Sequence, residues 1–243
     1  MKKMFNKNIK LVALLILITI LLTGCLYPQE RRAENQVPYL DQLQSVQSAV
    51  NQFQEATGGL LPIKDRDMDT PIYQKYPIDF NRLMPRFMQD APGNAFESGG
   101  VFLYVLVNVE TEPTVKLIDL RVAEQLREVN LRINMYRNQN RFTPVSEPLS
   151  NTAFRLDHEK LNYDTAPHIV SPFTGNNLPI IVDTSGNAIV DYSMDLYEYL
   201  QTKEHTYEQG DDIRDILVEH SVFVPAFSVP YTIDENNEPI FLN

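Results

Sequence analysis

The chain has little cysteine, histidine or positive charge, and it has no tryptophan. Its 243 residues include one cysteine and four histidines. A single cysteine excludes an internal disulfide framework and any zinc site built on two or four cysteines. No H-E-x-x-H spacing, phosphate-binding glycine loop or G-x-S-x-G nucleophile elbow is present. The formal charge of −11 argues against nucleic-acid binding, because contacts to phosphates need clustered lysine and arginine. We therefore predict no enzyme activity, no metal, no cofactor and no nucleic-acid partner.

The first 24 residues have the pattern of a bacterial export signal. Four lysines precede an apolar run, Leu11–Leu22, whose length suits a signal peptide and is too short to span a bilayer alone. The next residues, Leu22-Thr23-Gly24-Cys25, resemble the lipobox of bacterial lipoproteins. That resemblance implies cleavage between Gly24 and Cys25 and a diacylglycerol group on the Cys25 thiol. The alternative is an uncleaved anchor with Cys25 unmodified, and the position of the only cysteine favours the lipobox.

Cleavage leaves a strongly acidic body. Residues 1–24 carry four lysines and no acid, so the formal charge of residues 25–243 is −15. An anionic leaflet repels such a body, and attachment therefore depends on the lipid. Residues 25–37 are polar and aperiodic, which is typical of a tether. We predict a lipid-anchored protein on the extracytoplasmic face of the cell membrane.

The rest of the chain contains an internal repeat with an offset near 80 residues. Val50–Phe53 corresponds to Ile133–Tyr136, Asp79–Leu83 to Asp157–Leu161, and Pro92 to Pro172. We interpret this as a tandem duplication over residues 38–118 and 119–192. Residues 193–243 contain C-terminal helices and a truncated third hairpin.

Each copy has the pattern of a helix, a proline-containing loop and a β-hairpin. Apolar residues recur every three or four positions from Leu40 to Phe53 and from Val122 to Tyr136. Asp119 is the expected N-cap of the second helix, and Gly58-Gly59 the expected end of the first. Hairpins are predicted at 101–107 with 115–118, 180–182 with 189–190, and 230–234 with 239–241, and a short helix at 211–219. The sequence thus predicts an α+β fold in which the copies pack into one body.

Two family resemblances add to these patterns. Residues 26–36, 58–63 and 70–76 (including Gly-Gly-Leu-Leu-Pro-Ile and Thr-Pro-Ile-Tyr-Gln-Lys-Tyr) resemble the YphF-like membrane lipoproteins of Bacillus and its spore-forming relatives. This resemblance implies a Gram-positive lipoprotein with no established activity, and some members carry a transporter binding-protein label. The order of helix, Gly and Pro, Gly-Asn and hairpin is similar to the globular part of type II secretion pseudopilins, which implies an α+β packing unit only.

Other candidate sites have plainer explanations. Asp65, Asp67 and Asp69 begin like a calcium loop, but Thr70 and Tyr76 stand where that loop needs Gly and Glu. We interpret these acids as a solvated loop, and the four histidines as surface or packing residues: His158, His168, His205 and His220. Aromatic residues crowd the first copy and are interpreted as core, with a ligand wall as the alternative: Tyr73, Tyr76, Phe80, Phe87, Phe96 and Phe102.

The leading hypothesis for function is a non-enzymatic interaction module of the cell envelope that binds a protein partner. The proline-rich loop 60–92 and the strand edge Pro239–Leu242 are its candidate surfaces. The alternative is a small-ligand binding lipoprotein associated with an ABC-type transporter, which requires a cleft between the copies. An envelope hydrolase without a recognisable motif is a third hypothesis.

Overall fold

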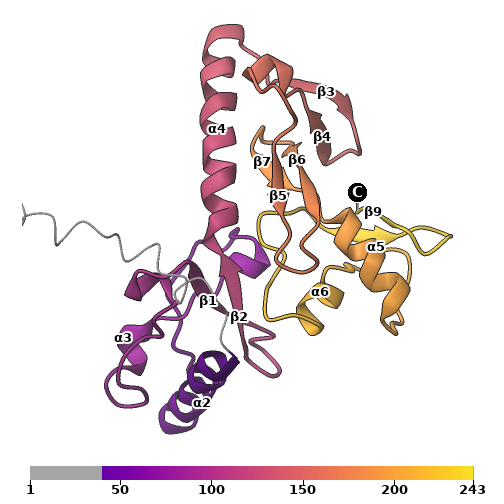
Figure 1. Cartoon of the computed structure of the whole chain (residues 1–243). Coiled ribbons are helices and arrows are strands. Elements are labelled where there is room, and N and C mark those ends of the chain that lie inside the picture. Colours follow the sequence, from indigo (N-terminus) through magenta and orange to yellow (C-terminus); the bar gives the residue numbers. More distant parts are fainter. Residues whose placement is uncertain (1–39, 243) are drawn as a thin grey trace, which may run out of the picture.

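The computed structural model of the chain describes residues 40–242, which form a mixed α+β fold as predicted (Figure 1). The predicted export signal, the lipobox at Cys25 and the tether lie outside the described residues. Within residues 40–242, no helix combines the length and the apolar character that crossing a bilayer requires.

The first part consists of a long helix, three short ones and a hairpin. These are α2 (Leu40–Thr57), η4 (Ile72–Gln74), α3 (Phe80–Leu83), η5 (Phe96–Ser98), β1 (Phe102–Val107) and β2 (Thr114–Asp119). The predicted face of α2 is buried, from Leu43 to Phe53, and packs with the inner side of the antiparallel hairpin β1–β2. Gly58 and Gly59 have positive φ angles and end α2 as expected, because glycine has no Cβ to clash in that region.

Helix α4 (Leu120–Asn140) follows β2 without a linker and stands upright above the first part, beside the strands that follow it in the chain (Figure 1). The predicted N-cap is confirmed: the Asp119 carboxylate accepts a hydrogen bond from the backbone N–H of Arg121 at 3.0 Å. The predicted apolar face is buried at Val122, Leu126, Val129 and Ile133. At the other end, Arg141 takes the left-handed conformation that ends the helix.

The second part surrounds strand β6. The sheet has the order β3-β4-β6-β5, and β7 also pairs with β6. The strands are β3 (Val145–Pro148), β4 (Ala153–Leu156), β5 (His168–Val170), β6 (Asn177–Asp183) and β7 (Ala188–Val190), and η6 (Glu159–Leu161) lies between β4 and β5. The predicted β6–β7 hairpin is confirmed. Strands β3, β4 and β5 were not predicted, because they are short and depend on pairing with β6, directly or through β4.

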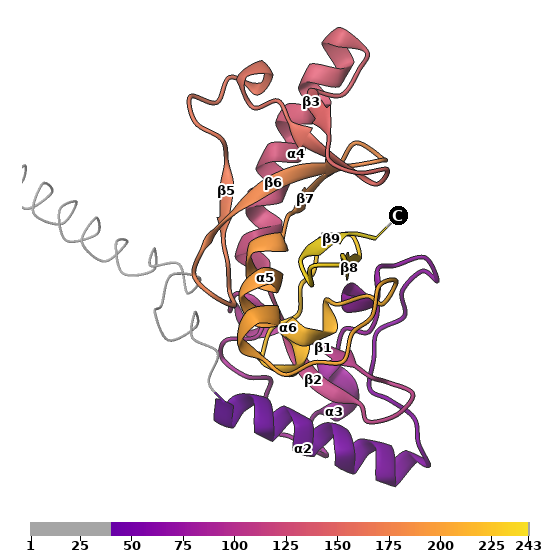
Figure 2. The same ribbon diagram turned by 90° about the vertical axis from the view of Figure 1, so that its right-hand side faces the viewer.

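The third part comprises α5 (Ser193–Thr202), α6 (Asp215–Glu219), β8 (Tyr231–Ile233) and β9 (Pro239–Phe241) (Figure 2). The predicted β8–β9 hairpin is confirmed. Helix α6 is shorter than the predicted 211–219, because Asp212 and Ile213 have other partners. The Asp212 carboxylate accepts from the N–H of Arg214, and the N–H of Ile213 donates to the carbonyl of Tyr231.

The segment after α6 packs directly on the first hairpin. The N–H of Leu117 donates to the carbonyl of Val222 at 2.9 Å, and the N–H of Val224 donates to the carbonyl of Leu117 at 3.0 Å, which makes a parallel bridge beside β2. Between these contacts, the buried Phe223 ring lies against Phe102 of β1 and Phe173 of the second part. The C-terminal segment therefore joins the first part of the chain to the second, and we refer to these two parts as the two halves.

Candidate functional site

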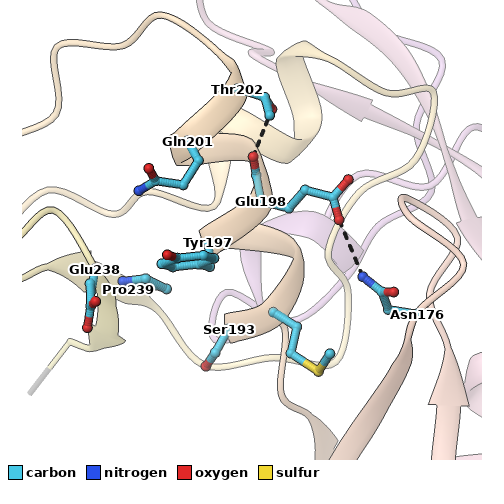
Figure 3. Close-up of a pocket in the computed structure, with 9 residues that line it drawn as sticks. Asn176, Ser193, Tyr197, Glu198, Gln201, Thr202, Glu238 and Pro239 are labelled. Carbon is cyan, nitrogen blue, oxygen red and sulfur yellow. Dashed lines mark hydrogen bonds between the residues drawn. The ribbon is translucent and has the colours of Figure 1, made fainter.

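A groove with a volume of about 690 Å³ lies between α5 and the start of β9 (Figure 3). One face of α5 forms its floor, and the turn before β9 forms one side (Figure 3). The residues that matter most for its chemistry are Ser193, Met194, Tyr197, Glu198, Glu238 and Pro239.

The fold of α5 explains why apolar side chains face this groove. Leu196 and Leu200 point into the core and are almost fully buried. The helical period of 3.6 residues then turns Met194 away from the core and places Tyr197 at the flank of the buried face, where they are 48% and 47% exposed. Pro239 of β9 lines the groove across from them. Two large apolar side chains of α5 thus remain open to solvent in one region.

A buried carboxylate holds the first turn of α5 in place. Asp195 is fully buried and accepts hydrogen bonds at 2.6 Å from the hydroxyls of Ser171 and Thr174, in the loop between β5 and β6. Burial raises the pKa of the Asp195 carboxyl, and the two hydroxyls act in the opposite direction. The floor of the groove is therefore attached to a second element of the fold, which keeps its shape defined.

The outer edge of β9 offers few backbone groups. The N–H of Asp234 donates to the carbonyl of Glu238, and the N–H of Leu242 donates to that of Pro230. Because hydrogen-bonded pairs alternate along an antiparallel ladder, the N–H and C=O of Ile240 face β8, and those of Phe241 face away. Pro239 also faces away and has no N–H. The predicted edge at Pro239–Leu242 is therefore poorly suited to strand addition, and its side chains are the better contact surface.

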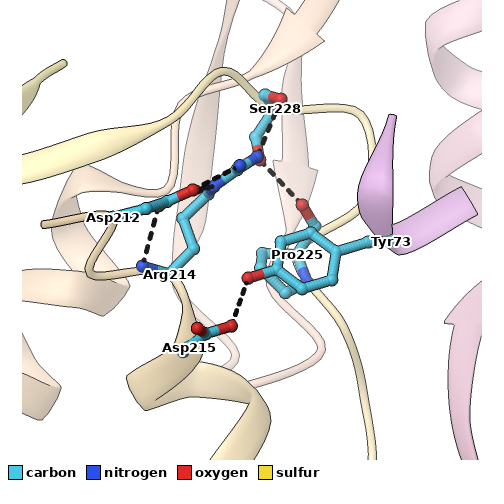
Figure 4. Close-up of polar contacts among 6 residues, drawn as sticks. All are labelled: Tyr73, Asp212, Arg214, Asp215, Pro225 and Ser228. Atoms are coloured by element: carbon cyan, nitrogen blue, oxygen red, sulfur yellow. Dashed lines mark hydrogen bonds and ion pairs between the residues drawn. The ribbon is translucent and has the colours of Figure 1, made fainter. Parts of the chain in front are cut away.

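A second region lies where the three parts of the chain meet (Figure 4). The Arg214 guanidinium pairs with Asp212 through two nitrogens, at 2.6 Å from Nη2 to Oδ2, and donates to the carbonyl of Ser228 at 3.2 Å. It also lies 5.0 Å from the ring centroid of Tyr73, whose hydroxyl donates to Asp215 at 2.8 Å. Burial and the Asp215 charge raise the pKa of Tyr73 far above its usual value, so its hydroxyl stays a donor.

Two clefts flank this cluster. One has a volume of about 370 Å³ and is lined by Tyr73, Tyr76 and Asp215 together with the end of β1 and the turn that follows it. The other has a volume of about 570 Å³ and lies between Ile72, the β6–β7 turn and the segment after Phe227. Phe227 has a φ of 61°, a left-handed conformation that costs a bulky residue free energy. The larger of the two clefts is lined by residues of both predicted copies and of the C-terminal segment.

The other predicted candidates lie apart from these regions. Among residues 40–242, no three His, Cys, Asp or Glu side chains come together as a metal site. His158 precedes η6, and His168 and His220 are exposed. His205 lies 3.2 Å from the Asn237 amide and stacks on Tyr207.

The aromatic residues of the first part mostly belong to the core, as interpreted from the sequence. Tyr73, Phe80 and Phe102 are buried, whereas Phe96 is 61% exposed. Tyr73 and Tyr76 also line the smaller cleft, and they are the part of loop 60–92 that reaches it together with Ile72. These two tyrosines therefore agree with both interpretations, because they pack in the core and also line a cleft.

Part of the chain matches a known protein family. Residues 39–119 match the model of the YphF family N-terminal domain. The chain is thus YphF-like over about a third of its length, from α2 to the last residue of β2, and the resemblance proposed from the sequence is confirmed there. No curated protein and no solved structure matches the chain.

The segment that matches the YphF N-terminal domain contributes one side of the Tyr73–Arg214 cluster and its two clefts, which we call the seam, and residues outside the match complete it. Tyr73 and Lys116 of the matched segment contact α6 and its flanks, at Asp215 and at the carbonyls of Val218 and Ser221. The predictions from the sequence did not include the buried Arg214 or the exposed Met194 and Tyr197. Met194 and Tyr197 carry a detectable signal, because they are apolar residues three positions apart beside a helix face that Leu196 and Leu200 already fill.

Proposed function

We propose that the protein is a lipid-anchored module on the extracytoplasmic face of the cell membrane, and that it binds a protein partner through the groove between α5 and β9. The observation that carries the proposal is the exposure of Met194 and Tyr197 in this groove, beside Pro239. Exposed apolar side chains gathered in one place are typical of protein-binding surfaces. We propose a binding role and not an enzymatic one: the Ser193 hydroxyl in the groove donates to the Asp191 carboxylate, and among the residues that the structure describes no histidine lines the groove to act as a base.

The proposed location depends on Cys25. The Leu22–Cys25 lipobox, together with the short apolar run before it, supports lipid attachment at this thiol. Replacing Cys25 with Ala should leave an unprocessed or released protein, measured by membrane fractionation and intact mass. Membrane retention of the variant with a normally processed mass, acyl chains included, would contradict this assignment.

The groove is tested by site-specific photo-crosslinking in the native membrane. A photoreactive phenylalanine analogue at position 197 of the lipidated protein should give a discrete adduct with a partner. The same analogue at position 131 is the matched control, because Leu131 is 61% exposed on α4, away from the groove. Adding Met194→Asp should remove the adduct at position 197. Identical adducts at the two positions, or none at 197, would count against a partner in the groove.

The second candidate function is small-ligand binding at the seam, in connection with a transporter. The two clefts beside Tyr73 and the left-handed Phe227 favour this candidate. A native mass spectrum of soluble residues 26–243 after mild purification tests it. A small co-purified mass that is lost when Tyr73→Ala opens the seam would support it, and a clean apo spectrum would favour the interaction module.

We also propose that the two α+β units arose by duplication. Support comes from α3 and η6, short helices that follow Asp79 and Asp157 in corresponding segments. In each, the aspartate accepts a hydrogen bond from a backbone N–H, of Asn81 and of Lys160. The second unit differs by strands β3, β4 and β5, which have no counterpart among the described residues of the first.

A further inference from the structure

The charges around the α5–β9 groove are of one sign. Two glutamates line it, Glu198 and Glu238, and no lysine, arginine or histidine does. They lie on opposite sides of Tyr197 (Figure 3). The Glu198 carboxylate accepts only a long hydrogen bond, 3.4 Å, from the Asn176 amide, which is uncharged. Within residues 40–242, neither glutamate forms an ion pair.

The basic residue nearest to Glu198 in the sequence, Lys203, contacts an aromatic ring instead. Lys203 directly follows the last residue of α5, and its ammonium lies 5.9 Å from the centre of the Tyr199 ring. Tyr199 is not part of the groove lining. Both glutamates are exposed, so a ligand that enters the groove can reach their carboxylates.

The surface between the glutamates is apolar and adaptable. Met194 is an unbranched side chain that fits partners of different shape, and Tyr197 presents a flat ring with a polar tip. Pro239 adds a rigid apolar surface across from α5 (Figure 3). An occupant that matches this surface places an apolar side chain over Tyr197 and a positive charge on each side of it.

We propose that the groove takes an apolar peptide segment with lysine or arginine on both flanks, supplied by a partner protein. This inference rests on the proposed function and specifies the chemistry of the partner at the same site. The net charge of −15 on residues 25–243 attracts a basic partner over longer distances, and the two glutamates direct its segment to this groove.

The test uses soluble residues 26–243 and a short fluorescent peptide with a Leu-Phe-Leu centre and two lysines at each end. Binding is measured by fluorescence anisotropy at low and high salt. We expect saturable binding that weakens with salt, and at least about tenfold weaker binding for the double variant Glu198→Lys, Glu238→Lys. Tyr197→Ala should also weaken binding, and a companion peptide with glutamates in place of the lysines should not bind.

A matched variant separates local charge from total charge. The double variant Glu124→Lys, Glu128→Lys changes the net charge equally on α4, where both glutamates are largely exposed and pair with arginines of the same helix. Its affinity for the peptide should stay within about twofold, because these positions do not line the groove and salt screens charges at longer range. Equal loss of binding in both double variants would overturn the inference, and so would equal binding of the two peptides.

Crosslinking at position 197 distinguishes this inference from the proposed function. If Glu198→Lys, Glu238→Lys abolishes the adduct in membranes, a basic segment occupies the groove. If the adduct persists at full yield in that variant, a partner binds but its basic character is refuted. Circular dichroism of each variant confirms that the fold is intact before binding is compared.

Discussion

Replacing Phe223 with Ala should strongly destabilise the protein, because this residue fills the contact between its two halves. The side chain is 7% exposed, and its ring centroid lies 5.7 Å from that of Phe102 and 6.4 Å from that of Phe173. Phe173 in turn packs edge-to-face on the buried Tyr192. Truncation removes the ring from the core of the first part and from its contact with Phe173, which packs against both cores, and leaves a cavity bordered by aromatic neighbours.

The expected cost is about 3–5 kcal/mol, the range for burying Ala in place of Phe in a packed core. This is a large share of the about 5–15 kcal/mol that stabilises a typical domain. For a chain of this size, each kcal/mol lowers the melting temperature by about 2–4 °C, so we expect a decrease of about 10 °C. Phe223→Leu keeps much of the volume and should cost about 1.5 kcal/mol or less.

Urea unfolding of soluble residues 26–243 measures these costs. Circular dichroism and tyrosine fluorescence serve as probes, since the chain has 12 tyrosines and no tryptophan. Phe96→Ala is the control, because Phe96 is 61% exposed, and should change stability by no more than about 0.5 kcal/mol. A cost below about 1 kcal/mol for Phe223→Ala would refute the view that this ring joins the two halves.

Three further predictions concern single polar or backbone positions. Lys116→Ala should lower the free energy of unfolding by about 1–3 kcal/mol in urea, because the Lys116 ammonium donates to two carbonyls near the end of α6 at 2.6 Å each. Lys160→Ala is the control: it removes an exposed ion pair and should be nearly neutral. The pKa of Asp195 is raised by burial, so the folded state binds its proton more tightly, and stability is lost as pH rises from about 4 through the folded pKa. The melting temperature of Asp195→Asn relative to that of the parent should therefore rise as pH increases from 4 to 7. A difference in melting temperature that stays constant across that range would contradict this reasoning. Gly100→Ala should prevent normal folding, seen as loss of soluble protein, because its Cβ would lie 2.1 Å from the Asn94 carbonyl carbon; normal yield and melting temperature would show that the backbone can move aside.

Local patterns predicted the long helices and all three hairpins. The face of α4 from Val122 to Ile133 and its cap at Asp119 follow from residues within one or two turns of each other, so the sequence displays them directly. The glycines that end α2 are predictable for the same reason, since a positive φ is a property of single residues. The aromatic core of the first part also follows from the density of Phe and Tyr there.

The seam could not be predicted, because its residues are far apart in the chain. Tyr73 and Asp215 are 142 positions apart, and their hydrogen bond exists only after the C-terminal part folds against η4. Strands β3 and β5 are likewise too short and too polar to show a period of their own, and pairing within the sheet around β6 stabilises them. Arg214 looks like any surface arginine in the sequence, yet its side chain is 7% exposed.

The sequence alone therefore determined the α+β class, the main helices and hairpins, the acidic charge and the prediction of a lipid anchor at Cys25. These depend on composition, short-range periodicity and a four-residue motif. Tertiary structure decided which apolar side chains stay exposed, because Met194 and Leu196 differ only in the direction that α5 turns them. It also decided that Glu198 and Glu238 lie on either side of Tyr197, since the docking of β9 beside α5 brings together residues 40 positions apart.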